Sequence, residues 1–489
     1  MLGDTPMRKM LLMLAVATLT ACAVGPNYHR PSAPEPSHFK EADGWKPAEP
    51  REAASGTNWW SVYDDALLDT LEQQVEVSNQ TLKASEAAWR QAVAVAQAAG
   101  AQLYPTTAVA ANAQRSRGTT SSFTNTSTGT RVRSAPVNEF SVTGSAAWDL
   151  DIWGKIRRTV EGDVASAKAT QAELAAARLS AQATLAIDYV ELRVADEQRQ
   201  LLADTITGYE RSLQITQNQY KVGVAAKADV ITAQTQLDGA KSQQIGLGVT
   251  RAQLEHAIAV LVGTPPADFS IAPAPLGATI PVVPAGLPSA LLERRPDIAD
   301  AERKMAAANA QIGVAVAAYF PDLTLSGTYG FASNVSSGLL HAPNNVWSVG
   351  AGLSDPLFDF GARRYQVHAA RAAYDATVAN YRQTVLTAFQ QVEDELAALR
   401  ILEQQYAVAN QTVQDANLAV SLTLNQYKAG IVAYTAVVTA QATALTDAQS
   451  LLSIRQSRLV ASATLIQALG GGWSTQDLSA IHVALPTPL

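Results

Sequence analysis

Two stretches of this chain are almost identical: residues 216–223 read TQNQYKVG and residues 423–430 read TLNQYKAG. They lie 207 residues apart, and the same offset carries Gly263 onto Gly470. A constant offset without insertion over so long a span indicates a duplicated unit, which has to be settled before any local pattern is interpreted. The sequence therefore predicts two copies of one supersecondary unit.

Long helices are predicted ahead of both motifs. No proline occurs between Pro136 and Pro265 or between Pro356 and Pro486, and both windows are rich in helix-forming residues. The larger side chains recur at alternating steps of four and three, which is the heptad spacing of helices that supercoil around nearly parallel neighbours. In the first copy these residues are Leu202, Ile206, Tyr209, Leu213, Thr216 and Tyr220. Each helix should run for roughly 65 residues, on the order of 100 Å.

Each long helix ends at a glycine, Gly223 or Gly430, that can take the positive φ of a helix terminus. A second helix follows each glycine, at about residues 228–262 and 435–469, so each pair should form a long helical hairpin. Apolar or small side chains flank the two glycines and should form the tips of the hairpins: Val222, Val224, Ala429 and Ile431. Taken alone, these hairpins would suit a structural coiled-coil rod.

Composition limits the function. The chain has 489 residues, of which 16% are charged, and a net charge of −7. It offers no basic patch for nucleic acid. The six histidines show no metal-ligand spacing and no phosphate-binding loop is present, so we expect neither an enzyme nor a bound cofactor.

The amino terminus reads as a secretory signal. Arg8 and Lys9 precede a short apolar segment, residues 10–19, that is too short to span a membrane. Translation could start at Met1 or at Met7. Residues 19–22 read LTAC and resemble the lipobox of bacterial lipoproteins. That resemblance implies removal of residues 1–21, an N-acyl and S-diacylglyceryl lipid on Cys22, and sorting to the outer membrane.

Proline-rich segments divide the rest. Residues 22–58 should form an extended strap, and residues 265–290 should connect a first repeat, 59–264, to a second repeat, 291–472, with a tail at 473–489. The first repeat opens with a helix capped by Asp64 or Asp65 and running to about residue 102. In the second repeat Pro296 suits a first helical turn.

Four segments switch to period-two alternation, at about residues 105–114, 138–151, 322–332 and 346–356. One face is apolar and the other carries small polar side chains, least clearly in the first segment, where alanine blurs the two faces. Asp149 and Asp151 are expected on the polar face. Such strands suit either an outer-membrane barrel or a half-buried soluble hairpin. Aromatic residues near strand ends (Trp148, Tyr329, Trp347) and the signal sequence favour the barrel.

Four strands cannot close a barrel, because about eight are needed. Open edges in lipid would leave backbone groups without hydrogen bonds, at several kcal/mol each. The barrel must therefore be shared between chains: two copies would give eight strands, and three would give twelve.

The repeated QYKxG tips, the opening Trp59-Trp60, LLERRPDI at residues 291–298, and the Tyr-Pro and Phe-Pro dipeptides before the strands occur together. In this combination the chain resembles the TolC-like outer-membrane efflux proteins, in particular their lipid-anchored NodT branch. The resemblance covers nearly everything from Cys22 to about residue 472.

The resemblance implies a mixed α/β membrane protein: a homotrimer with a twelve-stranded barrel above a periplasmic tunnel of α-helices. It implies an exit duct of a tripartite efflux pump, with tips that dock onto a periplasmic adaptor protein and an RND-type inner-membrane transporter as a further partner. Two alternatives remain: the duct of a type I protein-secretion system, and a structural envelope lipoprotein without a pore.

The tunnel should narrow just past the tips. Many family members carry an Asp immediately before the Ala-Gln of the second copy, but this chain has Thr439 there and Thr232 in the first copy. We therefore expect closure by Tyr434 and the two threonines, with Asp229 paired to a lysine of a neighbouring protomer.

Overall fold

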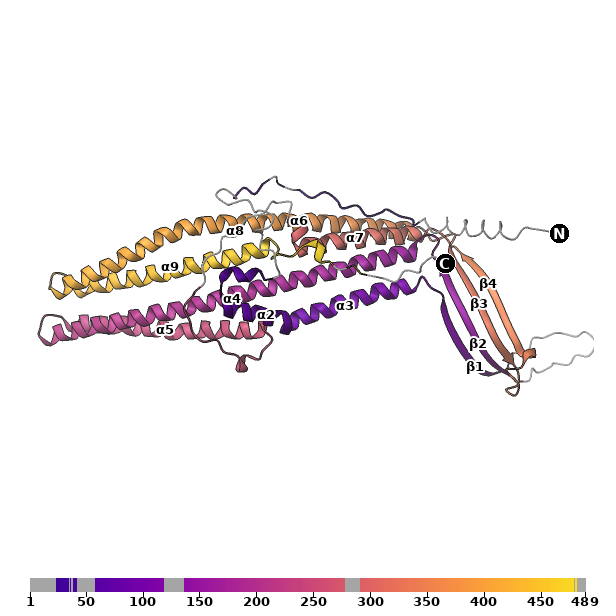
Figure 1. The fold of residues 1–489 in the computed structure, drawn as a ribbon, viewed down its shortest axis with the longest axis horizontal. Coiled ribbons are helices and arrows are strands. Elements are labelled where there is room, and N and C mark those ends of the chain that lie inside the picture. The colour runs from indigo at the N-terminus through magenta and orange to yellow at the C-terminus, as the bar shows by residue number, and fades with distance from the viewer. Residues whose placement is uncertain are drawn as a thin grey trace, which may run out of the picture.

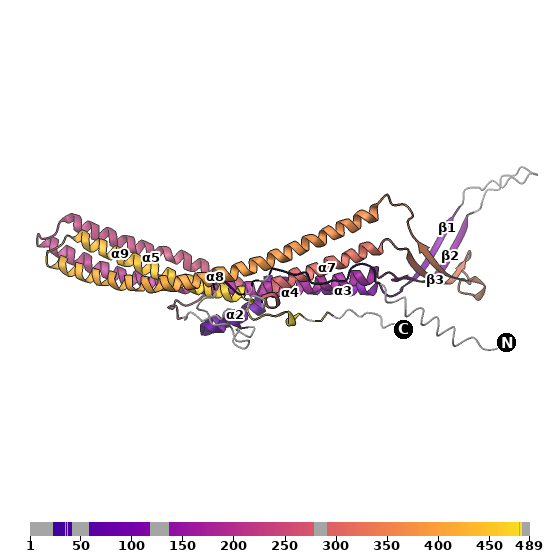
Figure 2. The same ribbon diagram turned by 90° about the horizontal axis from the view of Figure 1, so that it is seen from above.

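The computed structural model describes residues 23–34, 36, 38–41, 58–117, 136–277, 291–478 and 480–481. The signal peptide, Cys22, most of the second half of the strap, residues 278–290 of the connector and residues 482–489 lie outside this set. The chain is elongated: a four-stranded sheet forms one end, and two helical hairpins reach the other (Figure 1; Figure 2).

The duplication is confirmed by the helix bounds. The long helices are α4 (Lys155–Lys221) and α8 (Ala362–Lys428), each of 67 residues. The return helices are α5 (Lys227–Leu261) and α9 (Tyr434–Ala468), each of 35 residues. Every bound in one copy lies 207 residues from its counterpart, because glycines end the helices at the same places.

Shorter helices complete each copy. They are α2 (Ala66–Ser78) and α3 (Gln80–Ala101) in the first, and α6 (Leu291–Arg294) and α7 (Pro296–Ala317) in the second. Pro296 opens α7 as predicted, and the side chain of Asp65 caps α2 as predicted.

The single helix predicted up to about residue 102 is wrong, because the chain breaks at Asn79. The Asn79 backbone is extended, with ψ 123°, and its side-chain oxygen accepts a hydrogen bond from the backbone N–H of Leu82 at 3.0 Å. An asparagine that caps the following helix in this way ends the preceding one.

The return helices end against the short helices at what we call the waist. Gly263 and Gly470 both have positive φ, 73° and 95°. A Cβ atom on either would collide with a backbone carbonyl oxygen, that of Ser78 or that of Arg294. The same close backbone approach therefore occurs once in each copy.

A side chain seals each waist contact. Asn79 donates to the carbonyl oxygen of Leu261 at 2.8 Å, and Arg295 donates to that of Ala468 at 3.0 Å. Leu261 and Ala468 are equivalent positions, and Asn79 and Arg295 both precede the helix that leads to the strands. Both copies thus make the same hydrogen bond to the end of the return helix, with an amide donor in the first copy and a guanidinium donor in the second.

The sheet is antiparallel with strand order β1-β2-β3-β4. Its strands are β1 (Thr106–Ser116), β2 (Val137–Leu150), β3 (Asp322–Ser333) and β4 (Asn345–Ser354). β1 and β4 are the edge strands, so within the described residues the four strands do not close into a barrel, as predicted. Short 3-10 helices occur at Trp59–Tyr63, Pro266–Asp268, Ala342–Asn344 and Thr475–Asp477.

The strap and the connector are more embedded than their proline content predicts. On the strap, Phe39 is buried and packs edge-on against Phe389 of α8. On the connector, Ile271 is buried and its carbonyl oxygen accepts from Arg251, which also donates to the buried Asp196 at 2.8 Å. Side chains from α4 and α5, with Arg455 of α9, thereby hold the described part of the connector.

Most of the apolar core lies in the helical body around the middle of α4 and α8. A second, separate cluster lies near the tips. Among the helices that the structure describes, none is both long and apolar enough to cross a membrane.

Candidate functional site

The sheet has two chemically distinct faces. Directly paired residues share a face and neighbours along a strand alternate, so the register assigns every residue to one side. Trp148 pairs with Leu325, and Tyr329 with Trp347, on the apolar face. That face carries Val109, Phe140, Val142, Trp148, Leu150, Leu323, Leu325, Tyr329, Phe331, Trp347, Val349 and Leu353.

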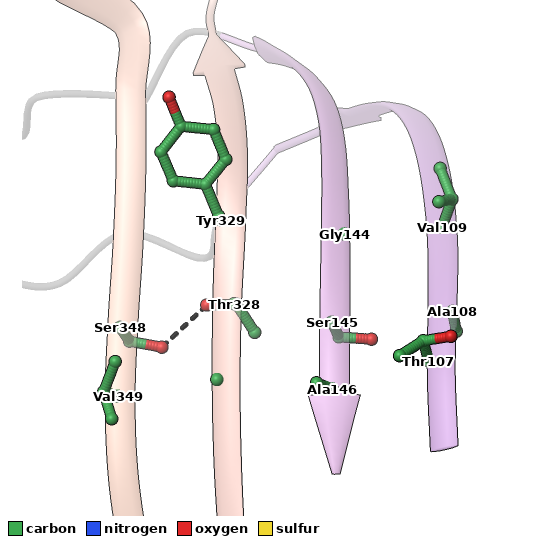
Figure 3. A pocket seen from close by; sticks show the side chains of 11 residues that line it. Thr107, Ala108, Val109, Gly144, Ser145, Ala146, Thr328, Tyr329, Ser348 and Val349 are labelled. Atoms are coloured by element: carbon green, nitrogen blue, oxygen red, sulfur yellow. Dashed lines mark hydrogen bonds between the residues drawn. The ribbon is translucent and has the colours of Figure 1, made fainter. Parts of the chain in front are cut away.

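The opposite face is lined by small polar side chains. Ala108, Ser145, Thr328 and Ser348 form one row across all four strands, and the Thr328 and Ser348 hydroxyls are hydrogen-bonded at 2.7 Å. Figure 3 shows this pair within a concavity of about 570 Å³ that extends over all four strands. Its lining of Gly, Ala, Ser and Thr, with Val109, Tyr329 and Val349, offers no convergent charged groups, which suits a wall rather than a ligand site.

Asp149 lies on the polar face, paired with Thr324. Asp151 does not, and its prediction is wrong. β2 ends at Leu150, and the Asp151 carboxylate instead accepts from the backbone N–H groups of Ile156 and Arg157, both at 2.9 Å. It therefore caps α4, where a carboxylate meets the unsatisfied N–H groups and positive end of the helix dipole.

The two tips lie together at the end farthest from the sheet (Figure 1). In each, the glycine has positive φ (81° for Gly223, 74° for Gly430). The N–H of Val224 donates to the carbonyl of Gln219, five residues back, at 2.8 Å, and an equivalent bond closes the second tip. These bonds are those of a helix-ending glycine turn.

The tips are apolar and open. Val222 is 74% exposed and Ile431 71%, with Val224 and Ala429 also exposed. A Cβ atom on either tip glycine would meet nothing within 4 Å in this chain. The tip geometry thus leaves room for a close contact from outside the chain.

Tyr434, one of the predicted gate residues, is buried within the chain. Its side chain is 2% exposed and packs at a tilt against Tyr427, with ring centroids 5.2 Å apart. Burial raises the pKa of Tyr434 to about 12. Together with residues of α4, α5, α8 and α9 it forms what we call the tip cluster: Ile206, Tyr209, Leu213, Ala233, Leu237, Ala240, Tyr427, Tyr434 and Val437.

The other three predicted gate residues are closer to the surface. Thr232 and Thr439 are exposed, and their hydroxyls donate to their own helices, to Ala228 and Thr435, at 2.9 and 3.0 Å. The Asp229 carboxylate accepts from the backbone N–H of Ala226 at 3.2 Å and so caps α5.

A buried polar contact joins the two hairpins beside the tip cluster. Gln441 of α9 is 7% exposed and donates to the hydroxyl of Ser212 of α4 at 2.9 Å. The heptad pattern predicts neighbouring helices here, but a single sequence gives no signal for which helix they meet. Gln441 was therefore missed.

The strap follows the body from the sheet end. The N–H of Val24 donates to the carbonyl oxygen of Trp153, just beyond β2, at 3.0 Å. Arg158 of α4 donates to the carbonyl oxygens of Val24 and Gly25, at 3.2 and 3.3 Å, and to the side chain of Asn27 at 2.8 Å. Cys22 itself lies outside the described residues, but its described neighbours start at the junction between sheet and helices.

Within the part of the chain that the structure describes, no group of three or more His, Cys, Asp or Glu side chains is arranged to hold a metal ion.

Comparison with known proteins gives the family. The family model for outer membrane efflux proteins matches residues 71–264 and 287–471. The chain is 30% identical over 476 residues to the probable efflux pump outer membrane protein TtgC of Pseudomonas putida, covering 96% of this chain and 97% of that one. It is 30% identical over 473 residues to the pyoverdine export outer membrane protein OpmQ of Pseudomonas aeruginosa, covering 96% and 98%.

A solved structure agrees. The outer-membrane channel OprN superimposes with a TM-score of 0.86 at 27% identity, over 92% of this chain and 100% of that one. The two-faced sheet, the paired 67-residue helices and these similarities lead to one assignment: the chain belongs to the outer membrane efflux protein family.

Proposed function

We propose that three copies of this chain form the outer-membrane exit duct of a tripartite efflux pump. The observation that carries the proposal is the two-faced four-stranded sheet with open edges, joined to helices of 67 residues. The apolar face suits lipid, and the small polar face suits a water-filled lumen. The duct is passive, with no catalytic residue, metal or cofactor.

The bare face of α8 supports assembly. α4 is covered by neighbours within the chain, whereas α8 exposes a series of apolar side chains along its length. They include Leu386, Ile401, Val408, Leu418 and Leu422. Apolar side chains in such a row favour burial against further helices of a homotrimer.

The tips are the proposed docking points for a periplasmic adaptor protein, which would link the duct to an RND-type inner-membrane transporter. Val222, Gly223 and Val224 in the first copy and Ala429, Gly430 and Ile431 in the second would make this contact. Apolar side chains around bare glycines permit close backbone approach by a partner. One relative is named for pyoverdine export, and we propose a small molecule as the exported compound here.

A lipid on Cys22 would add a second attachment. Arg158 and Trp153 hold the strap at the sheet–helix junction, so an acyl chain on the preceding cysteine would start close to the sheet. Cys22→Ser should abolish incorporation of labelled fatty acid and leave the signal uncleaved by the lipoprotein peptidase. The barrel should still assemble, because a closed barrel outweighs marginal acyl anchoring. Unchanged labelling of the variant would contradict lipidation.

For the gate, we propose that Thr232 and Thr439 line the narrow end, while the buried Tyr434 holds α9 in place behind them. Asp229 would cap α5 and face a lysine of the neighbouring copy. Thr439→Asp should then add cation selectivity and block by divalent cations from the periplasmic side, measured on single channels.

Two measurements test the duct. Purified protein in a planar bilayer should give discrete conductance steps, and a silent bilayer would favour a structural lipoprotein. Deleting the chain should raise sensitivity to small toxic compounds. If the deletion instead blocks export of a protein without changing drug sensitivity, a type I secretion duct is the better assignment.

A further inference from the structure

The loop between β4 and α8 leaves large apolar side chains bare. Leu357 and Phe358 are more than four-fifths exposed, and Phe360 is fully exposed. The loop is nonetheless held in place, because Arg363 donates to the carboxylate of Asp359 at 2.7 Å. Phe360 takes a φ of 52°, which is unusual for a bulky residue and can mark a functional constraint. An ordered loop that presents such side chains marks a contact surface.

The equivalent loop of the first copy is covered. Trp153, 207 residues before Phe360, stacks on Phe320 with ring centroids 4.6 Å apart and an angle of 22° between the planes. Its indole N–H donates to the carbonyl oxygen of Pro321 at 2.9 Å. The residue that covers Trp153 thus comes from the segment between α7 and β3, the strand next to its own.

Two offsets relate the strands of the two copies. The Tyr-Pro and Phe-Pro dipeptides that precede β1 and β3 are 216 residues apart, and the glycines that begin α4 and α8 are 207 residues apart. Applied to the β1–β2 pair Thr106↔Ala147, these offsets give Asp322↔Ser354. That pair is the observed register of β3 and β4. The offsets therefore reproduce one observed pairing without adjustment.

The same offsets can be applied to the pairing of β2 with β3. The pair Ala147↔Ser326 maps onto Ser354 and Ala110, which lie on the two free edges of the sheet. Both positions belong to the polar face, so the two faces stay continuous across the junction. The offsets also carry the Trp153–Phe320 stack onto Phe360 and Tyr104.

Within one chain these residues cannot meet, because β1 and β4 are at opposite edges of the sheet. We propose that β4 of one copy pairs antiparallel with β1 of a second copy in the register Ser354–Ala110, and that Phe360 stacks on Tyr104 across that junction. Phe360 has no N–H to reproduce the indole hydrogen bond, so stacking alone closes the second junction. The inference rests on the proposed trimer and specifies its register.

Cysteine pairs test the register. The lone natural cysteine is Cys22, and its proposed lipidation would leave no competing thiol. Ser354→Cys combined with Ala110→Cys should give covalent dimers and trimers on a denaturing gel after oxidation, because directly opposed strand positions lie within disulfide reach. Ser354→Cys combined with Asn112→Cys or with Ala108→Cys, two residues out of register on the same face, should lose this product.

The possible outcomes distinguish a wrong strand register from a failure of the proposed trimeric duct. If native mass measurement finds a trimer but a shifted pair cross-links best, the register is wrong and the duct stands. If the unmodified chain forms no trimer, the proposed function fails. A disulfide formed within one chain would overturn the edge-to-edge contact.

The ring contact has its own test. Phe360→Ala should lower the temperature at which the trimer dissociates in detergent, and Phe360→Trp, the residue of the first copy, should restore it. The matched control is Tyr365→Ala, which removes another exposed ring on the first turn of α8. Equal losses for Phe360→Ala and Tyr365→Ala, or no loss for Phe360→Ala, would contradict the stack.

Discussion

Four glycines with positive φ end the helices of the two hairpins, two at the waist and two at the tips. The surroundings of the waist pair differ completely from those of the tip pair. At the waist, a side chain on Gly263 or Gly470 would collide with a backbone carbonyl. At the tips, a side chain on Gly223 or Gly430 would meet nothing within 4 Å. The backbone requirement is the same at both ends, but only the waist glycines are also required by packing within the chain.

The difference separates what holds the protomer together from what it offers to others. At the waist, neighbouring helix ends are satisfied by side chains of the same chain, as with Asn79 and Leu261. At the tips, apolar side chains remain bare after every contact within the chain has been made. Apolar side chains left bare at both tips are best explained by a contact with a partner.

Substituting valine at matched glycines gives the largest expected contrast. Gly470→Val places a β-branched residue at positive φ and drives its Cβ into the carbonyl of Arg294, so a cost of about 4 kcal/mol or more is expected. Folded protein in the membrane should be lost. Gly430→Val carries only the backbone strain and should still assemble, as judged by trimer yield. Equal yields would erase the distinction between waist and tip.

The sequence predicts the repeat and the helical hairpins well because their signals are local. Heptads, proline-free windows and terminal glycines give helix bounds within about two residues of those found. The break at Asn79 was missed because asparagine within a helical pattern is unremarkable until its side chain is seen to cap. Asp151 was predicted to continue strand β2, but it caps helix α4 instead. The sequence pattern does not separate the two because the strand ends only one residue before Asp151.

The site is less predictable because its geometry depends on which helices meet. Tyr434 is a predicted gate residue, and the sequence did not predict that its side chain packs against α4 and α5 of the other hairpin. The arginines that hold the connector come from positions far apart in sequence, such as Arg193 and Arg455. Periodicity identifies a buried face without identifying its partner.

The second largest contrast is expected between the effects of substituting two equivalent tyrosines near the tips. Tyr427 is 6% exposed within the tip cluster, whereas Tyr220, its counterpart, is 46% exposed. Tyr427→Ala should cost about 3 kcal/mol locally through the cavity it leaves, and Tyr220→Ala much less. Tryptic cleavage at Lys428 in the detergent-solubilised protein should accelerate only in the first variant. Similar acceleration in both would mean that the two hairpins pack alike.

A buried carboxyl makes the waist sensitive to pH. Glu72 of α2 is 0% exposed and neither of its oxygens has a hydrogen-bond partner. Burial, with a contribution from Asp69, raises its pKa from 4.5 to about 9. Between these two values the folded protein keeps a proton on Glu72 that the unfolded chain loses. The free energy of unfolding is therefore highest below pH 4.5 and falls as the pH rises towards 9.

Glu72→Gln should remove this dependence. The wild type should lose up to about 1.4 kcal/mol per pH unit within that window relative to the variant. Thermal midpoints measured from pH 5 to 9 provide the check. Glu76→Gln on the same helix, where the carboxylate is half-exposed and pairs with Arg178, is the control. A variant whose midpoint falls with pH as steeply as the wild type would show that Glu72 is ionised in the fold.

The smallest effect is expected at Asp229, which belongs to the tip and to no packed core. Its carboxylate accepts one backbone hydrogen bond, from Ala226, at the start of α5. Its counterpart in the second copy is Ala436, so α9 begins without an acidic cap. Asp229→Ala should therefore cost about 1 kcal/mol or less, and the thermal midpoint of the whole protein should not move. Amide exchange at the first turn of α5 should speed up.

If Asp229 also faces a neighbouring lysine, resting conductance should rise modestly and the rise should vanish at high salt, because an exposed ion pair is screened. A faster first turn with unchanged conductance would leave Asp229 as a helix cap and remove it from the gate.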